Sequence, residues 1–239
     1  MNGPMIVIAG AGSGKTRVLT YKIAYLMTQG VDPFNILALT FTNKAAKEMK
    51  ERIADIVGDE AKNLWMGTFH SVFARILRIE AHKIGYTSNF TIYDSDDSQK
   101  LVARIIKELN LDKEQYKYKI IFSRISSMKN NFISADQYIN DDEMLLSDKV
   151  SNRPKFHEIY KQYVERCFKA GAMDFDDLLL KTNELLNSYP DTLSKYQNIF
   201  RYILVDEYQD TNHSQYLIIR SLSDKFQNIC VVGDDAQSI

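Results

Sequence analysis

The feature that most constrains this chain lies at residues 6–16, where a short apolar run leads into a glycine-rich turn ending in Gly14-Lys15-Thr16. An [AG]xxxxGK[ST] spacing lets backbone N–H groups surround a phosphate, brings the lysine ammonium to its oxygens and directs the threonine hydroxyl at Mg²⁺. An ordinary glycine turn is the alternative, but the full pattern with these flanks rarely arises by chance. We interpret the segment as a P-loop. The expected nucleotide-binding residues are Ala9, Gly10, Ala11, Gly12, Ser13, Gly14, Lys15, Thr16 and Arg17.

Composition indicates a globular protein. With 239 residues and 45% hydrophobic content, the chain can bury a core in one large or two modest domains. No stretch reaches the roughly 20 apolar residues of a membrane span, and the N-terminus has no secretory signal pattern, so we expect no membrane partner and a cytoplasmic location. Cys167 and Cys230 lack metal-ligand spacing and are expected to be buried free thiols.

The net charge of −1 does not by itself indicate nucleic-acid binding. Acidic residues outnumber basic ones in residues 172–239, whereas basic residues exceed acidic ones early in the chain, around Lys44, Lys47, Lys50 and Arg52. This basic group suits a phosphate backbone and suits a solvated helix face equally well.

Short apolar runs alternate with helical patterns through the first third of the chain. Runs that read as strands lie at residues 36–41 and 64–68, and the helical patterns end at Gly30, Gly58 and Gly85. Three successive strand–helix units predict an α/β fold with a parallel sheet.

The alternation stops near residue 93 and gives way to helical spacing up to residue 171. Strand patterns return at residues 202–205 and 229–233, so the α/β domain is predicted to be split by an inserted α-helical subdomain. The polar and acidic segment 140–154 is the best candidate for a mobile loop. The predicted parts are 1–92, the first part of the α/β domain; 93–171, the helical insertion; and 172–239, its second part.

A second group of polar residues follows the strand at residues 202–205. Asp206 and Glu207 would emerge at the carboxyl edge of the sheet, beside the P-loop, where open α/β sheets bind ligands. There Asp206 would hold Mg²⁺ and Glu207 would position or deprotonate a water. Taken alone, the pair suits a loop start or a helix N-cap better than a functional role, but together with the P-loop it favours the functional interpretation. The polar segment 233–239 follows another strand and could contact a γ-phosphate.

Six segments together resemble superfamily 1 DNA helicases of the UvrD/PcrA/Rep type. They cover residues 9–16, 40–46, 67–71, 173–178, 206–212 and 233–239. The phrases TFTNKAA and DEYQDTN are far more specific than a P-loop alone. In that family the corresponding motifs belong to the first RecA-like domain and its helical insertion, so the resemblance implies a RecA-like fold.

The resemblance also implies roles for individual residues. Lys15 and Thr16 would bind phosphate and Mg²⁺, Asp206 would support the metal, and Glu207 would be the catalytic base. Gln209 and Gln237 would sense the γ-phosphate of ATP. The residues expected to line a single-stranded DNA track are Thr40, Phe41, Asn43, Thr68, Phe69 and His70.

Several of these assignments have structural alternatives. Phe41 could offer a stacking face to a base or be a buried strand residue. His70 could contact DNA or occupy an N-terminal helix position. Asp174 and Asp176, in the fourth motif, suit a helix cap slightly better than a DNA role.

The resemblance leads to a functional expectation. The chain is expected to be the N-terminal motor fragment of an ATP-dependent helicase that moves 3′ to 5′ on single-stranded DNA and opens duplex junctions, in repair or replication together with other proteins of those processes. The second RecA-like domain, with its arginine fingers, would follow Ile239, so the fragment alone would hydrolyse ATP poorly. Relatives usually carry an adenine-recognition glutamine before the P-loop and an aspartate where Ala236 stands.

Three other functions remain open at this point. A helicase–nuclease subunit shares these motifs. A regulatory module that binds nucleotide without hydrolysis would not need Glu207. A small-molecule kinase with a P-loop would have no role for TFTNKAA.

Overall fold

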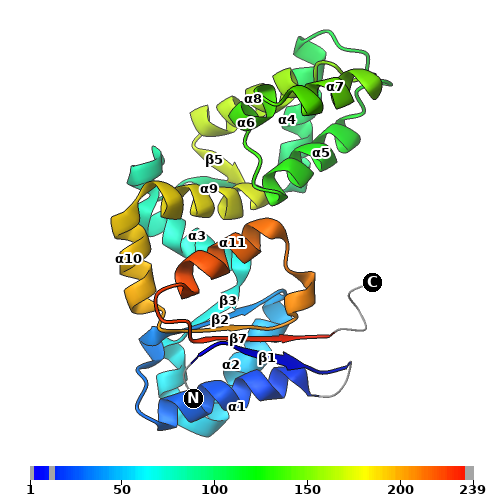
Figure 1. Ribbon diagram of the computed structural model, residues 1–239. Coiled ribbons are helices and arrows are strands. Elements are labelled where there is room, and N and C mark those ends of the chain that lie inside the picture. The colour runs from blue at the N-terminus through cyan, green and yellow to red at the C-terminus, as the bar shows by residue number, and fades with distance from the viewer. Residues whose placement is uncertain (1–2, 11–13, 235–239) are drawn as a thin grey trace. The chain divides into compact units, whose positions relative to one another are not determined.

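The computed structural model describes residues 3–10 and 14–234 and contains two parallel sheets (Figure 1). The strands are β1 (Met5–Ile8), β2 (Ile36–Thr40), β3 (Trp65–Thr68), β4 (Thr91–Tyr93), β5 (Ala172–Asp174), β6 (Tyr202–Val205) and β7 (Ile229–Gly233). The α-helices are α1 (Lys15–Thr28), α2 (Asn43–Val57), α3 (Phe69–Glu80), α4 (Ser95–Glu108), α5 (Tyr118–Asn130), α6 (Ala135–Ile139), α7 (Asp142–Val150), α8 (Phe156–Lys169), α9 (Phe175–Ser188), α10 (Pro190–Ile199) and α11 (His213–Ser223). Short 3₁₀ turns are η1 (Pro33–Asn35), η2 (Gly58–Asn63), η3 (Ala81–Ile84) and η4 (Tyr208–Asp210).

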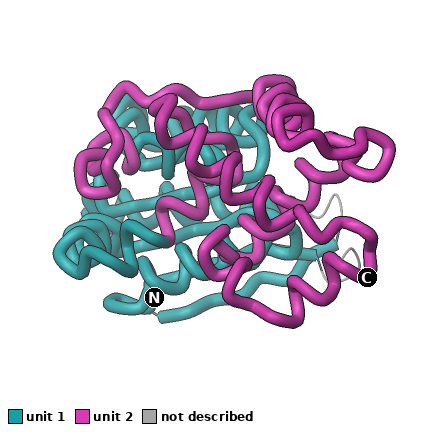
Figure 2. The backbone as a smooth tube through the Cα atoms, turned by 90° about the horizontal axis from the view of Figure 1, so that it is seen from above, with its two compact units in different colours: residues 1–75, 184–239 teal, residues 76–183 magenta. Residues whose placement is uncertain are grey.

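The chain forms two compact units (Figure 2). The first comprises residues 1–75 and 184–239, and the second comprises residues 76–183. The boundaries between the units differ from the domain boundaries expected after residues 92 and 171. They fall inside helices α3 and α9. Each helix is continuous there, so no turn residue marks the change in the sequence.

The main sheet belongs to the first unit and has the order β1-β7-β6-β2-β3, with every neighbouring pair parallel. The strands expected at residues 36–41, 64–68, 202–205 and 229–233 are confirmed to within one residue at each end. The α/β fold class is therefore confirmed. In a parallel sheet all carboxyl ends lie at one edge, and every predicted functional segment of this unit follows such an end.

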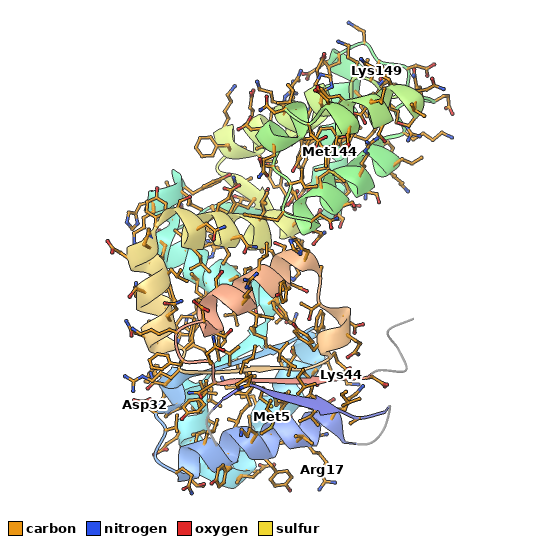
Figure 3. All side chains as sticks on the ribbon, viewed as in Figure 1. Met5, Arg17, Asp32, Lys44, Met144 and Lys149 are labelled. Carbon is orange, nitrogen blue, oxygen red and sulfur yellow. The ribbon has the colours of Figure 1, made fainter. Side chains whose placement is uncertain are left out.

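Helix α2 shows how local sequence defines an element of this unit. The Thr42 hydroxyl accepts the N–H of Ala45 at 3.1 Å at its start, and Gly58 ends it with φ +75°. On its outer side Lys44 is exposed and lies 3.9 Å from Glu48, one turn further on (Figure 3). The basic group around Lys44 therefore has the arrangement of a solvated helix face.

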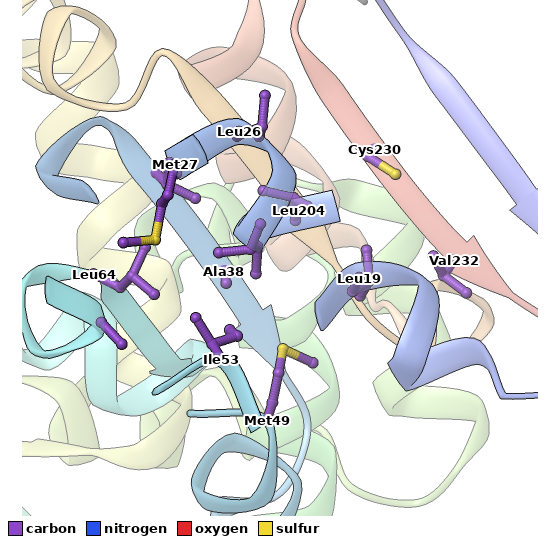
Figure 4. Packing of buried hydrophobic residues seen from close by; sticks show 13 residues of the cluster. Leu19, Leu26, Met27, Ala38, Met49, Ile53, Leu64, Leu204, Cys230 and Val232 are labelled. Atoms are coloured by element: carbon purple, nitrogen blue, oxygen red, sulfur yellow. The ribbon is translucent and has the colours of Figure 1, made fainter. Parts of the chain in front are cut away.

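The inner side of α2 packs with α1 on one face of the sheet (Figure 4). Leu19 and Ile23 of α1 and Met49 and Ile53 of α2 are fully buried. Their strand partners are Ile36, Ala38, Leu204, Cys230 and Val232. On the opposite face lies α11, which begins at a capping box between Asn212 and Gln215 and buries Ile218, Ile219 and Leu222 (Figure 1).

The second unit has its own aromatic core. Tyr138, Phe156, Tyr160 and Tyr163 are fully buried, and the Tyr138 and Phe156 rings meet edge to face with centroids 5.1 Å apart. Strands β4 and β5 pair in parallel at the two ends of this helical segment. Neither strand is predicted from the sequence, because three residues are too few to show a periodicity.

The prediction of a mobile loop at residues 140–154 is wrong. Helix α7 occupies most of this segment, and the Asp141 side chain caps it by accepting the N–H of Met144 at 3.0 Å. The acidic residues that suggested a loop, Asp142 and Glu143, lie in its first turn, where the helix dipole favours negative charge.

A buried ionic cluster joins α5 to the start of α9 within this unit. Lys129 has no exposed surface, and its Nζ lies 2.7 Å from Asp174 Oδ2 and 2.8 Å from Asp177 Oδ1. The two aspartates also bond each other's backbone N–H groups, at 2.8 and 3.2 Å. This reciprocal cap explains why α9 begins where it does.

Two further expectations concern the whole chain. Cys167 and Cys230 are buried and form no disulfide, as predicted. Among the residues that the structure describes, no helix is both long enough and apolar enough to span a bilayer.

Candidate functional site

The candidate nucleotide site lies at the carboxyl ends of β1, β7 and β6. The backbone hydrogen bonds between neighbouring strands continue for one residue beyond the ends of β1 and β6. The N–H of Ala9 donates to the Gly233 carbonyl at 3.0 Å, and the N–H of Asp206 donates to the Leu39 carbonyl at 3.0 Å. The residues that follow neighbouring strands are therefore held side by side by backbone hydrogen bonds.

Lys15 opens α1 after Gly14, whose φ of +91° is a conformation that glycine adopts without strain. The Lys15 side chain is 8% exposed, and its Nζ lies 3.2 Å from Glu207 Oε2 and 3.2 Å from Asp234 Oδ2. Burial lowers the pKa of Lys15, but the two carboxylates outweigh it and raise the pKa above its usual value. The ammonium is therefore charged and held at the sheet edge.

Thr16 and Asp206 form the candidate metal site. The Thr16 hydroxyl donates to Asp206 Oδ2 at 3.2 Å, and Asp206 is 2% exposed. Burial, and then the charge of Glu207, raise the pKa of the Asp206 carboxyl. A buried carboxylate beside a second carboxylate is stabilised by a nearby cation, and carboxylate and hydroxyl oxygens are hard ligands of the kind Mg²⁺ takes. These residues fit Mg²⁺.

Glu207 has a backbone conformation that is uncommon for a residue with a side chain. Its φ is +47° and its ψ is +47°, in the left-handed region. Its backbone N–H donates a hydrogen bond to Asp206 Oδ1 at 3.1 Å. The carboxylate is half-buried and accepts a hydrogen bond from Gln209 Nε2 at 2.7 Å. Strained backbone of this kind is concentrated at functional sites.

Not every predicted nucleotide-binding residue lies at this cluster. The Arg17 guanidinium is over the Tyr21 ring, 6.0 Å from its centroid, and the side chain lies on the outer side of α1 (Figure 3). Ala9 is half-buried and Gly10 is exposed. The remaining predicted residues, Ala11, Gly12, Ser13 and Gln237, lie outside the described residues, as does Ala236.

Asp234 is a site residue that the sequence analysis left out of its assignments. It is 3% exposed and directly follows β7, which pairs with the strand before the P-loop. Its carboxylate bonds Lys15, and its backbone N–H donates to Gln209 Oε1 at 3.0 Å. Its position one residue after an apolar strand is the same signal that identified Asp206.

The predicted DNA-contacting residues lie at or just after the ends of β2 and β3, on the other half of the same edge. Thr40, Thr68 and Phe69 are buried, Phe41 and His70 are half-buried, and Asn43 is exposed. The Phe41 and Phe69 ring centroids are 5.4 Å apart. The buried Phe69 ring therefore packs against Phe41, and Phe41 is the aromatic residue of this pair with exposed surface.

The two threonines make local hydrogen bonds. The Thr40 hydroxyl donates to the Thr42 carbonyl at 3.2 Å, and Thr68 Oγ1 accepts the N–H of Ser71 at 3.2 Å, as an N-cap of α3. Asp174 likewise caps α9, whereas Asp176 accepts a hydrogen bond from Asn130 Nδ2 at 2.9 Å. These four side chains have structural roles in the part of the chain that the structure describes.

Comparison with known proteins identifies the family of the chain. Residues 1–239 match the family described as the UvrD/REP helicase N-terminal domain. The chain is 46% identical over 238 residues, 99% of its length, to the ATP-dependent DNA helicase PcrA of Staphylococcus epidermidis. It is 46% identical over 239 residues to PcrA of Bacillus subtilis and 45% identical over 238 residues to PcrA of Staphylococcus aureus.

The match covers the whole chain but spans only 32% of the length of each of these relatives. The family match extends over residues 1–239. The chain therefore belongs to the UvrD/REP helicase N-terminal domain family.

Proposed function

We propose that this chain is the first motor domain of a longer ATP-dependent DNA helicase. The observation that carries the proposal is the meeting of the P-loop residues Lys15 and Thr16 with the carboxylates of Asp206 and Glu207 at one sheet edge. A P-loop ATPase needs a phosphate-binding lysine, a metal-binding hydroxyl and carboxylate, and a group that orients water.

Each of these residues would have one task. Lys15 would exchange its contacts with Glu207 and Asp234 for contacts with the β- and γ-phosphates. Thr16 and Asp206 would hold Mg²⁺, which when bound neutralises charge on the phosphates. Glu207, released from Lys15, would accept a proton from the attacking water. Because Lys15 bonds Glu207 directly, phosphate binding and release of the base are coupled in this arrangement.

The DNA-binding half of the proposal rests on the ends of β2 and β3. Phe41 offers a half-buried ring backed by Phe69, and a stacked base contributes about 1–3 kcal/mol whatever its identity. Sequence-independent stacking suits a motor that moves along single-stranded DNA. We propose movement from 3′ to 5′, opening of duplex junctions, and a role in cytoplasmic DNA repair or replication with partner proteins of those processes.

The test is steady-state ATP hydrolysis by the full-length protein, with and without single-stranded DNA, using Glu207→Gln as the blank. We expect strong stimulation by DNA in the wild type and almost no turnover in the variant, with nucleotide and DNA binding retained. Turnover that ignores DNA would contradict the motor assignment and favour a nucleotide-binding regulatory module.

A further inference from the structure

Gln209 bridges the two residues whose carboxylates contact Lys15, Glu207 and Asp234. It belongs to the 3₁₀ turn η4, directly after β6. Its Nε2 donates to Glu207 Oε2 at 2.7 Å, and its Oε1 accepts the backbone N–H of Asp234 at 3.0 Å. Both ends of the amide are therefore engaged by the protein, one at each of two neighbouring strand ends.

The hydrogen-bonding partners fix which end of the amide is which. A carboxylate only accepts and a backbone N–H only donates, so the NH₂ must face Glu207 and the oxygen must face Asp234. The reverse orientation would place two acceptors together and two donors together. The Gln209 amide can therefore bridge Glu207 and Asp234 in only one of its two flip orientations.

The Gln209 amide approaches the end of β7 closely at Gly233. A Cβ added at Gly233 would lie 3.1 Å from Gln209 Oε1 and 3.6 Å from its backbone nitrogen. Gly233 thus lets the Gln209 amide approach the end of β7 closely.

We propose that Gln209 is a positioning residue, which orients the Glu207 carboxylate and links it to the backbone of Asp234. This inference rests on the proposed function, because it assumes that Glu207 is the base. It replaces direct γ-phosphate sensing by Gln209 with action through Glu207. When Lys15 moves to bound phosphates, the hydrogen bond from Gln209 remains to hold the carboxylate, and a shift of the β7 end reaches the base through the same amide.

The experiment separates positioning from nucleotide binding. In the full-length protein, Gln209→Ala should lower kcat about 10- to 100-fold, the usual consequence of misplacing a catalytic group by about an ångström. Dissociation constants for a fluorescent ADP and a fluorescent non-hydrolysable ATP analogue should change less than about twofold, since no phosphate contact is lost. Weaker binding of the ATP analogue alone would show direct γ-phosphate sensing and overturn the proposal.

A double-mutant cycle makes the test specific to Glu207. In single-turnover hydrolysis, Gln209→Ala should have no further effect in a Glu207→Gln background, because both changes disable the same group. Independent, multiplicative losses would refute the positioning role. If Glu207→Gln alone leaves turnover intact, the assignment of the base fails instead, which is a separate outcome.

Gln197→Ala is the matched control. Gln197 is also half-buried and lies in the same unit, but its amide donates to the Ser221 carbonyl at 2.8 Å, away from the site. It should leave kcat unchanged. Equal losses in Gln197→Ala and Gln209→Ala would reduce the effect to general destabilisation.

Discussion

Replacing Lys129 by methionine tests the buried ionic cluster of the second unit. Methionine has a similar length but no charge, so it removes the cation and leaves Asp174 and Asp177 facing each other inside the unit. In the wild type, burial opposes ionisation of Asp174, but the Lys129 ammonium outweighs it and holds the pKa of that carboxyl below its usual value. Burial and then the charge of Asp174 raise the pKa of Asp177 to about 6.

The size of the stability loss depends on the hydrogen bonds that the two aspartates keep in the variant. Breaking a buried ion pair by removing one partner costs about 3–5 kcal/mol. Asp174 retains a hydrogen bond from the Tyr163 hydroxyl at 2.7 Å, and each aspartate retains a backbone N–H. We therefore expect the free energy of unfolding to fall by about 3 kcal/mol at pH 8, the low end of that range.

The loss should depend on pH. Without the ammonium the pKa values of Asp174 and Asp177 rise in the folded state, so the folded variant binds more protons than the unfolded chain. Its stability then falls as pH rises, because the slope of the unfolding free energy follows the difference in bound protons. Relative to the wild type, Lys129→Met should be less destabilised at pH 5 than at pH 8, since protonated carboxyls need no counter-charge.

Urea unfolding followed by far-ultraviolet circular dichroism measures the free energy of unfolding of the wild type and of Lys129→Met at each pH. Trp65 is the single tryptophan and lies in the first unit, so its fluorescence follows that unit separately. Lys155→Met is the control, because Lys155 and Glu158 form an exposed pair, worth about 0–1 kcal/mol. Adding Asp177→Asn to Lys129→Met should restore part of the stability. A loss below about 1 kcal/mol at pH 8, or one independent of pH, would refute the reasoning.

Three further predictions concern the first unit. Lys15→Ala should abolish binding of fluorescent ATP in a titration, and unchanged affinity would contradict the P-loop assignment. Phe41→Ala should weaken single-stranded DNA binding by about 1–3 kcal/mol in fluorescence anisotropy, whereas Phe34→Ala, at a 51% exposed position in η1, should not; equal affinity would return Phe41 to a packing role. Gly233→Ala should lower kcat by displacing the Gln209 amide while nucleotide affinity stays unchanged, and an unaltered kcat would show that the contact is readily relaxed.

The sequence predicted the main sheet well, because its strands are long enough to show a pattern. The runs that became β2, β3, β6 and β7 are apolar and bounded by turn residues or helical periodicity, so their type and order were clear. Strands β4 and β5 were missed and α7 was mistaken for a loop. Three-residue strands carry no periodicity, and acidic residues favour loops and first helical turns alike.

The site was predicted in part, for a similar reason. Asp206 and Glu207 were predicted as site residues because they follow an apolar strand, whose carboxyl end is expected to lie beside the P-loop. Asp234 follows a strand in the same way, but nothing in the sequence states that β7 lies between β1 and β6. Strand order comes from non-local pairing, which the sequence does not display.

What the sequence determined by itself is therefore local: the phosphate-binding turn, the strand–helix alternation and the carboxylates at a strand end. Tertiary structure decided which of these groups meet. It brought Lys15 to two carboxylates from distant segments, buried Lys129 against Asp174 and Asp177, and joined the Gln209 amide to the backbone of Asp234. Turns and helical faces depend on residues within a few positions of one another, whereas burial and charge pairing depend on contacts between distant residues, which are 45 positions apart for Lys129 and Asp174 and 219 for Lys15 and Asp234.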